Sequence, residues 1–276
     1  MRFLIAILLS TFGGALPLAQ MVPFPGPASQ HFPMPVITGL SSTSATVGTS
    51  ITITGTSFGT SGTVTFNGTA ASISSWSSTS IAATVPDSTN GNVTVTTSVG
   101  TSNGVSFQIV PHLTSLSATT GYIGDSLTVS GTGFQGSGQV KFGGTVASNI
   151  SWSSTSIQAT VPTTLGAGVK TVTVKAPSSG QTSDNSKSFT VNAPHIGSLD
   201  PSNASLYYTT PITITGSGFG DSSSTVIATF NGIEIAVTGN TNSTVSAVLK
   251  CNSRGTFNIQ VQINGSSSNS ISFVCQ

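Results

Sequence analysis

The feature that most constrains the fold is a segment of about eighty residues that occurs three times along the chain. The segment around Trp76, residues 73–81, returns around Trp152 as residues 150–157. A glycine turn with a central phenylalanine is present in all three copies, at residues 55–59, 131–136 and 216–220. Self-similarity at a regular interval indicates an array of like modules. We therefore expect three domains, which span residues 36–110, 111–193 and 194–276.

Each copy is built from short runs in which valine or isoleucine alternates with threonine, as in residues 51–54, 93–96 and 212–215. A period of two places the apolar side chains on one face of a strand and the hydroxyls on the other. Asn-Gly or Gly-Gly follows Phe66, Phe142 and Phe230, which favours two-residue hairpins. About seven such strands per copy predict an all-β chain of three tandem immunoglobulin-like β-sandwiches. Because Pro111 and Pro194 directly follow the preceding strands, we expect short connections and a rod.

Charged side chains are scarce. The chain has 7 Lys and Arg residues and 6 Asp and Glu residues, which is 5% of the total, whereas about a quarter is usual. Nucleic-acid binding needs a basic surface. We therefore expect no nucleic-acid partner.

Residues 1–19 have the features of a secretory signal peptide. Arg2 precedes an apolar run over residues 3–9 that is too short to cross a bilayer, and Ala15 or Ala19 suits cleavage. No later segment is apolar enough to span a membrane. The sequence thus predicts a protein that is secreted and located outside the cell or on its surface.

Residues 20–35 form a proline-rich arm or linker. Its five prolines exclude a helix and favour an extended chain. One interpretation is a mobile tether. The other is an assembly arm that docks into a groove or against a sheet edge of a neighbouring subunit, with the apolar side chains Val22, Phe24, Phe32 and Met34.

The two cysteines lie in the third copy, which lacks the tryptophan of the other two. We expect a disulfide between Cys251 and Cys275 in an exported protein, worth about 3 kcal/mol. A zinc site would need two further ligands, and no histidine lies between them. Trp76 and Trp152 are predicted to seal one end of the core in the first two copies.

Each of the first two copies has the same order of features: a proline before a strand, the Gly-x-x-Phe turn, the Phe-Asn-Gly or Phe-Gly-Gly hairpin, and Ser-x-x-Ile-x-Ala-x-Val-Pro. This order resembles the IPT/TIG family of immunoglobulin-like domains, and the match weakens after Thr238. The turn residues Phe58, Phe134 and Phe219 are its most specific part. The resemblance implies early-type sandwiches of the kind used in extracellular proteins and in some transcription factors, whose basic loops this chain lacks.

No residue pattern indicates an enzyme or a cofactor. Residues 55–59 fit Gly-x-Ser-x-Gly, but a nucleophile elbow needs a helix after the turn, so Ser57 is interpreted as a turn residue. His112 and His195, which follow the junction prolines, are expected to form hydrogen bonds between modules. The acidic residues are isolated from one another; Asp125 and Asp221 are interpreted as turn caps, with an ion at a junction as the alternative.

The chain has several Asn-x-Ser/Thr sequons, all in expected turns or at strand ends, where a glycan stands clear of the core. The candidate N-glycosylation sites are Asn67, Asn92, Asn149, Asn203, Asn242 and Asn264. A eukaryotic source would glycosylate several of them.

Two functions from different classes agree with this sequence. The first is a non-enzymatic structural subunit that associates head to tail into an extracellular fibre or surface coat, through strand edges almost free of charge. The alternative is an adhesin or a module that binds glycans or another surface protein. The aromatic candidates for glycan contact are Tyr122 and above all Tyr207 and Tyr208; a competing interpretation places one of the last pair in the core and one at a junction.

Overall fold

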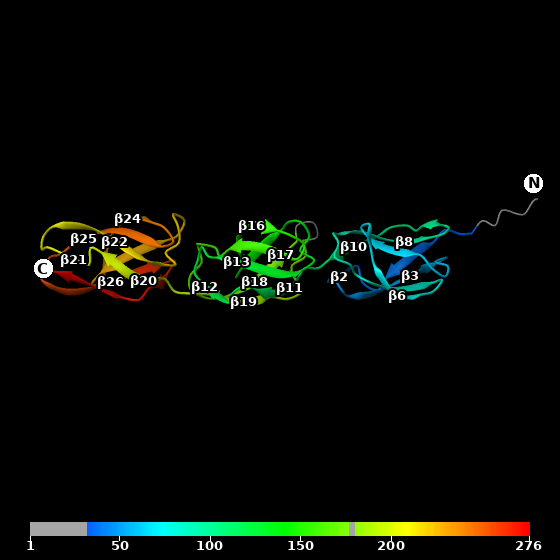
Figure 1. The fold of residues 1–276 in the computed structure, drawn as a ribbon, viewed down its shortest axis with the longest axis horizontal. Coiled ribbons are helices and arrows are strands. Elements are labelled where there is room, and N and C mark those ends of the chain that lie inside the picture. The colour runs from blue at the N-terminus through cyan, green and yellow to red at the C-terminus, as the bar shows by residue number, and fades with distance from the viewer. Residues whose placement is uncertain (1–31, 177–179) are drawn as a thin grey trace, which may run out of the picture. The chain divides into compact units, whose positions relative to one another are not determined.

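The computed structural model describes residues 32–176 and 180–276, without the side chains of residues 149 and 150. Throughout these residues the regular structure is β-strand, and no helix occurs (Figure 1). The all-β prediction of tandem immunoglobulin-like sandwiches is confirmed. The proposed signal peptide and most of the arm, with Val22 and Phe24, lie outside the described residues. We call residues 36–110 module 1, residues 111–193 module 2 and residues 194–276 module 3.

Module 1 has two sheets of antiparallel strands with one short parallel pair. One sheet has the order β1-β3-β7-β6, and the other has the order β2-β10-β8-β4-β5, with β9 beside β8. The strands are β1 (Val36–Leu40), β2 (Ser44–Ala45), β3 (Ser50–Thr56), β4 (Thr63–Phe66), β5 (Thr69–Ala70), β6 (Ser72–Trp76), β7 (Ser80–Thr84), β8 (Gly91–Thr97), β9 (Gly100–Thr101) and β10 (Val105–Ile109).

Module 2 repeats this arrangement with the orders β11-β13-β17-β16 and β12-β19-β18-β14-β15. Its strands are β11 (His112–Leu116), β12 (Thr120–Gly121), β13 (Ser126–Thr132), β14 (Gln139–Phe142), β15 (Thr145–Val146), β16 (Ser148–Trp152), β17 (Ser156–Thr160), β18 (Gly168–Lys175) and β19 (Lys187–Val191).

Module 3 joins its strands into one continuous path, β20-β22-β25-β24-β23-β26-β28-β21, with β27 beside β26. Its strands are β20 (His195–Asp200), β21 (Asn203–Ala204), β22 (Thr209–Ser217), β23 (Val226–Phe230), β24 (Ile233–Asn240), β25 (Thr244–Lys250), β26 (Gly255–Ile263), β27 (Ser266–Ser267) and β28 (Ile271–Cys275). The path is continuous because β24 pairs with β23 over its first residues and with β25 over its last ones. In module 1 this crossing between sheets is divided into the separate strands β5 and β6.

The cores follow the alternation in the sequence. In β3, Ile51 and Ile53 are buried, whereas the threonines between and after them are exposed. Each core contains an edge-to-face phenylalanine pair, for example Phe66 with Phe107 at 5.0 Å between ring centroids. Among the described residues, the buried apolar side chains form one cluster in module 1 and a second cluster that runs on from module 2 into module 3.

The glycine-phenylalanine turn is a packing unit. Phe58, Phe134 and Phe219 are fully buried. The ring of Phe134 lies so close to Gly131 that a Cβ there would be 2.4 Å from the ring and 2.1 Å from the carbonyl oxygen of His112. Only glycine fits this approach, which explains why the motif begins with it.

A polar side chain closes each of these turns from outside. Trp76 and Trp152 donate their indole N–H groups to the carbonyl oxygens of Phe58 and Phe134, at 3.2 and 2.9 Å, and both rings pack against the core. In module 3, Asn240 takes this role and donates from Nδ2 to the Phe219 carbonyl oxygen at 3.1 Å. An amide therefore satisfies the backbone group that indole satisfies elsewhere.

Each module also has an asparagine that clamps its first strand. In module 2, the backbone N–H of Leu113 donates to Oδ1 of Asn185, and Nδ2 of Asn185 donates back to the Leu113 carbonyl oxygen, both at 2.8 Å. Asn103 and Asn269 make the same pair of bonds in modules 1 and 3. The three asparagines were not among the residues that the sequence patterns singled out.

Neighbouring modules make direct contact at both junctions. Gly133 and Gly218 have positive φ and occupy the same turn position, and a Cβ would lie 2.8 Å from Ile109 at the first and 2.6 Å from the Tyr122 ring at the second. Ser57 occupies this position in module 1, also with positive φ. Glycine is thus present where a preceding module packs closely, and serine where the chain enters module 1.

Candidate binding site

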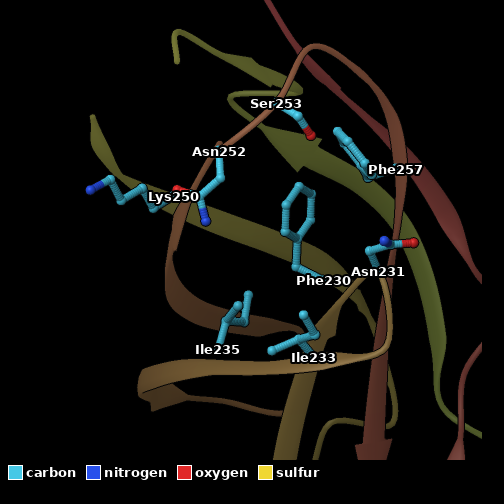
Figure 2. A pocket seen from close by; sticks show the side chains of 8 residues that line it. All are labelled: Phe230, Asn231, Ile233, Ile235, Lys250, Asn252, Ser253 and Phe257. Carbon is cyan, nitrogen blue, oxygen red and sulfur yellow. The ribbon is translucent and has the colours of Figure 1, made fainter. Parts of the chain in front are cut away.

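A pocket lies at the end of module 3 formed by the β23–β24 turn and the β25–β26 loop (Figure 2). Its volume is about 230 Å³, and the residues that line it are Phe230, Asn231, Ile233, Ile235, Lys250, Asn252, Ser253 and Phe257. Figure 2 shows the rings of Phe230 and Phe257 on one side and the two isoleucines at the turn. The pocket therefore combines an apolar wall with amide and hydroxyl groups at its rim.

The apolar wall exists because module 3 departs from its sister modules. The backbone bonds Asn67 N to Asn92 O and Asn231 N to Asn258 O are equivalent, so Phe257 corresponds to Gly91 of module 1. By the same criterion it corresponds to Lys170 of module 2. The ring of Phe257 packs against Phe230 at 5.2 Å between centroids. Phe230 is half-buried, whereas its counterparts Phe66 and Phe142 are buried.

The loop over the pocket is also specific to module 3. Pro86 and Pro162 follow β7 and β17, and proline has no N–H for a strand ladder. Lys250 occupies the corresponding position, and β25 continues through it, where Lys250 pairs with Thr209. The next residue, Cys251, forms a disulfide with Cys275 of β28, with 5.7 Å between the Cα atoms. The disulfide anchors the segment that carries Asn252 and Ser253.

The two adjacent tyrosines proposed for glycan contact lie beside this segment. The backbone N–H of Tyr207 donates to the carbonyl oxygen of Cys251 at 2.7 Å. Tyr207 and Tyr208 are 68% and 72% exposed, so the interpretation that placed one in the core and one at a junction is wrong. Tyr122 lies instead at the junction between modules 2 and 3, against Gly218.

Other candidate residues do not join this site. Ser57 lies in a turn, as the sequence indicates. The prediction that His112 bonds across modules is wrong, because its Nδ1 lies 2.8 Å from Oδ1 of Asp184 in the same module. Asp184 is next to the clamp residue Asn185, which places its carboxylate beside the first strand and His112. His195 is exposed.

Asp125 and Asp221 each cap a turn. Asp125 accepts the backbone N–H of Tyr122 at 2.7 Å, and Asp221 accepts the backbone N–H of Ser223 at 2.9 Å. Hydrogen bonds from the hydroxyl and then the amide of Ser223 hold the pKa of Asp221 below its usual value. Within residues 32–176 and 180–276, no group of three or more His, Cys, Asp or Glu side chains is arranged to hold a metal ion.

The sequon asparagines differ in the exposure of their side chains and in their hydrogen bonds. Asn67, Asn92 and Asn203 are exposed, while Asn242 and Asn264 are half-buried. Nδ2 of Asn264 donates to the carbonyl oxygens of Thr163 and Leu165 in module 2, at 2.7 and 3.0 Å. Asn242 lies against Gly124 of module 2. The side chain of Asn149 lies outside the described residues.

We predict that Asn264 stays unmodified when the chain is secreted from a glycosylating eukaryotic cell. A glycan on Nδ2 takes the place of one of its two hydrogens, so at least one hydrogen bond to module 2 would be lost, and the sugar would have to fit against module 2. Peptide mapping by mass spectrometry measures the occupancy of each sequon, and Asn203, which is exposed, is the internal comparison. A glycan at Asn264 in the folded protein would show that this junction does not form as described.

Comparison with known proteins identifies the family. The model of the IPT/TIG domain matches residues 35–109, 111–191 and 194–275. The chain belongs to this family, with three tandem copies. No match was found among the curated proteins.

Several solved structures are similar in fold. One, described as a crystal structure with a xylogluco-oligosaccharide, is 22% identical with a TM-score of 0.44, and the match covers 87% of this chain and 60% of that one. The surface glycan-binding protein PbSGBP-B from Prevotella bryantii is 18% identical with a TM-score of 0.37, and the match covers 58% of this chain and 41% of that one. Plexin A4 is 17% identical with a TM-score of 0.31, and the match covers 82% of this chain and 23% of the plexin. The chain thus spans less than two thirds of each of these proteins, and the likeness concerns the fold.

No helix in the part of the chain that the structure describes has the length and apolarity needed to cross a bilayer.

Proposed function

We propose that this chain is an extracellular or cell-surface binding protein, without catalytic activity, whose module 3 binds a carbohydrate. The observation that supports this most directly is the pocket between Phe230, Phe257 and Ile233, rimmed by Asn231 and Asn252. Sugar rings have apolar C–H faces and hydroxyl edges, which suit an apolar wall with amide groups at its border. The exposed Tyr207 and Tyr208 offer further aromatic contact beside the same loop.

The place of the pocket in the repeat supports a binding function. The loops at the same end of modules 1 and 2 contact the next module: Asp87 accepts a hydrogen bond from Ser154 at 2.8 Å, and Thr163 accepts one from Ser224 at 2.8 Å. The corresponding loop of module 3 carries the pocket and the disulfide instead. Modules 1 and 2 would then act as the scaffold that presents module 3.

The titratable groups favour binding over catalysis. Among the described residues, Lys250 is the one ionisable side chain that lines the pocket. Hydrolysis of a glycosidic bond uses a pair of carboxyl groups on either side of the bond. We therefore propose a module that holds a sugar without transforming it.

We expect Ile233→Gln to weaken glycan binding about tenfold, because it removes an apolar contact worth about 1.5 kcal/mol. Ile233 is 71% exposed, so the change should leave the stability of module 3 nearly intact. A glycan array followed by calorimetry on the full secreted chain measures the effect.

The matched control for this experiment is Val169→Gln. Val169 is 69% exposed and lies on β18 of module 2, far along the sequence from the pocket. A double variant of Tyr207 and Tyr208 to alanine tests the tyrosines separately. Equal binding by the Ile233 and Val169 variants would exclude this pocket as the glycan site.

The second candidate function is a structural subunit that assembles head to tail into an extracellular fibre or coat. It is favoured by apolar side chains exposed where the chain enters module 1, since Met34 and Val36 are 52% and 44% exposed, and Phe32 is 59% exposed. A head-to-tail contact onto module 1 could not have the same geometry as the two internal junctions, because those junctions have glycine at the turn position where module 1 has Ser57. Electron microscopy at high protein concentration distinguishes the two, because a fibre subunit must form filaments.

A further inference from the structure

Two cationic residues belong to the β25–β26 segment beside the pocket of module 3. Lys250 lines the pocket and Arg254 ends the same loop, in a chain with only 7 Lys and Arg residues. Modules 1 and 2 have the uncharged Pro86 and Pro162 where module 3 has Lys250. A cation at this position of the loop is therefore specific to the module that has the pocket.

Within the described part of the chain, no acidic side chain forms an ion pair with these two cations. The single ion pair among those residues joins His112 and Asp184 in module 2. Glu234 lies between Ile233 and Ile235 on β24, and successive side chains of a strand point to opposite faces, so its carboxylate is directed away from the pocket. The described residues that line the pocket include no Asp or Glu.

Lys250 combines an apolar stem with a charged end. Lys250 contributes to the pocket wall, and Figure 2 shows its side chain directed away from the phenylalanine rings, with its nitrogen outermost. A lysine with an exposed end and four flexible bonds can turn its ammonium group over the opening at little cost. The cation is thus available to a ligand that already occupies the pocket.

The volume limits the size of that ligand. Pockets for drug-sized molecules measure about 300–1,000 Å³, and this one measures about 230 Å³. It accommodates one sugar ring, with the rest of an oligosaccharide outside. The recognised unit is then a single sugar residue of a longer glycan.

We propose that the pocket binds a single anionic sugar residue, whose carboxylate or sulfate group is held by Lys250 with Arg254 as a second cation. The sugar ring packs against Phe257 and Ile233, and Asn252 and Ser253 meet its hydroxyls. This inference rests on the proposed carbohydrate-binding function and specifies its ligand class. Uronic acids and sulfated sugars share the chemistry, and matched pairs of oligosaccharides separate them.

The test uses an array of paired oligosaccharides that differ only in charge. Each uronic acid is printed beside its methyl ester, and each sulfated sugar beside its desulfated form. We expect the anionic member of a bound pair to bind about tenfold more tightly than its neutral partner, because a charge-assisted hydrogen bond is lost in the partner. The two kinds of pair show whether carboxylate or sulfate is preferred.

Substitutions of the two cationic residues test whether the preference for the anionic sugar arises at this pocket. Lys250→Gln should reduce the preference for the anion to about twofold or less, and Arg254→Gln should reduce it partly. The readout is the ratio of the two affinities, because the shortened side chain also removes part of the pocket wall that both partners contact. Lys187→Gln, on β19 of module 2, is the matched control and should keep the full preference. Added salt should weaken the wild-type preference and not the binding of neutral sugars.

Two outcomes overturn the proposal and are distinct from each other. Equal binding of charged and neutral partners, or an unchanged preference in the Lys250 variant, would refute the anionic ligand and leave the carbohydrate site standing. Absence of binding to every member of the array would refute the carbohydrate site as well.

Discussion

Replacement of Gly131 by alanine is expected to unfold module 2, with a loss of more than about 3 kcal/mol of unfolding free energy. The added methyl group would lie 2.1 Å from the carbonyl oxygen of His112 and 2.4 Å from the ring of Phe134. Neither atom can move easily, because the first belongs to a paired strand and the second is fully buried. Chemical denaturation followed by circular dichroism measures the change in all three modules, since module 3 has no tryptophan.

The control for this variant is Gly136→Ala in the same loop region. A Cβ at Gly136 would meet nothing within 4 Å, so its unfolding free energy should stay within about 0.5 kcal/mol of the wild-type value. Because the buried cluster of module 2 continues into module 3, the transition that shifts should include both modules and leave that of module 1 in place. Equal stability of the two alanine variants would contradict the packing described for the turn.

Removal of the disulfide by the double change Cys251→Ser and Cys275→Ser is expected to lower the stability of module 3 by about 3 kcal/mol. The cysteines are 24 residues apart, and the bond restricts the unfolded chain between them. Both side chains are buried, so the serine hydroxyls add a cost of their own. Thermal unfolding of the double variant, compared with the oxidised and reduced wild type, gives the size of the effect.

The same variant should also lose glycan affinity at temperatures where module 3 is still folded. Cys251 immediately precedes Asn252 and Ser253, which line the pocket, and its carbonyl oxygen holds Tyr207. A melting temperature within about 1 °C of the oxidised protein would contradict the stabilising role. Unchanged affinity would show that the loop is positioned without the bond.

The sequence predicts those features that follow from local periodicity. The alternation of Ile51 and Ile53 with threonine is confirmed by the burial pattern of β3, and Asn67 and Asn231 have the positive φ that the hairpins require. These features depend on residues next to each other along the chain. For this reason local patterns suffice to predict the fold class and the three copies of the family domain.

The candidate site depends on contacts between distant segments, and the sequence alone does not predict it. The residues around Phe257 in the sequence do not indicate a binding site. Phe257 contributes to the pocket because its ring packs against Phe230 on the neighbouring strand. The clamp residue Asn185 acts on Leu113, 72 positions earlier. Asn240 replaces a tryptophan with a different donor. Comparison of the copies does show one departure at this site, because the third copy has Lys250 where the other two have Pro86 and Pro162.

The Asn264–Gly265 sequence gives the hydrogen bonds of Asn264 to module 2 a limited chemical lifetime. Gly265 follows Asn264, and a residue without a side chain leaves its backbone nitrogen free to attack the neighbouring amide and expel ammonia. The carboxylate that forms on hydrolysis would face the carbonyl oxygens of Thr163 and Leu165, where the amide now donates. The two hydrogen bonds would be replaced by electrostatic repulsion between the new carboxylate and the two carbonyl oxygens. Molecules that persist for long outside a cell would therefore loosen between modules 2 and 3 as they age.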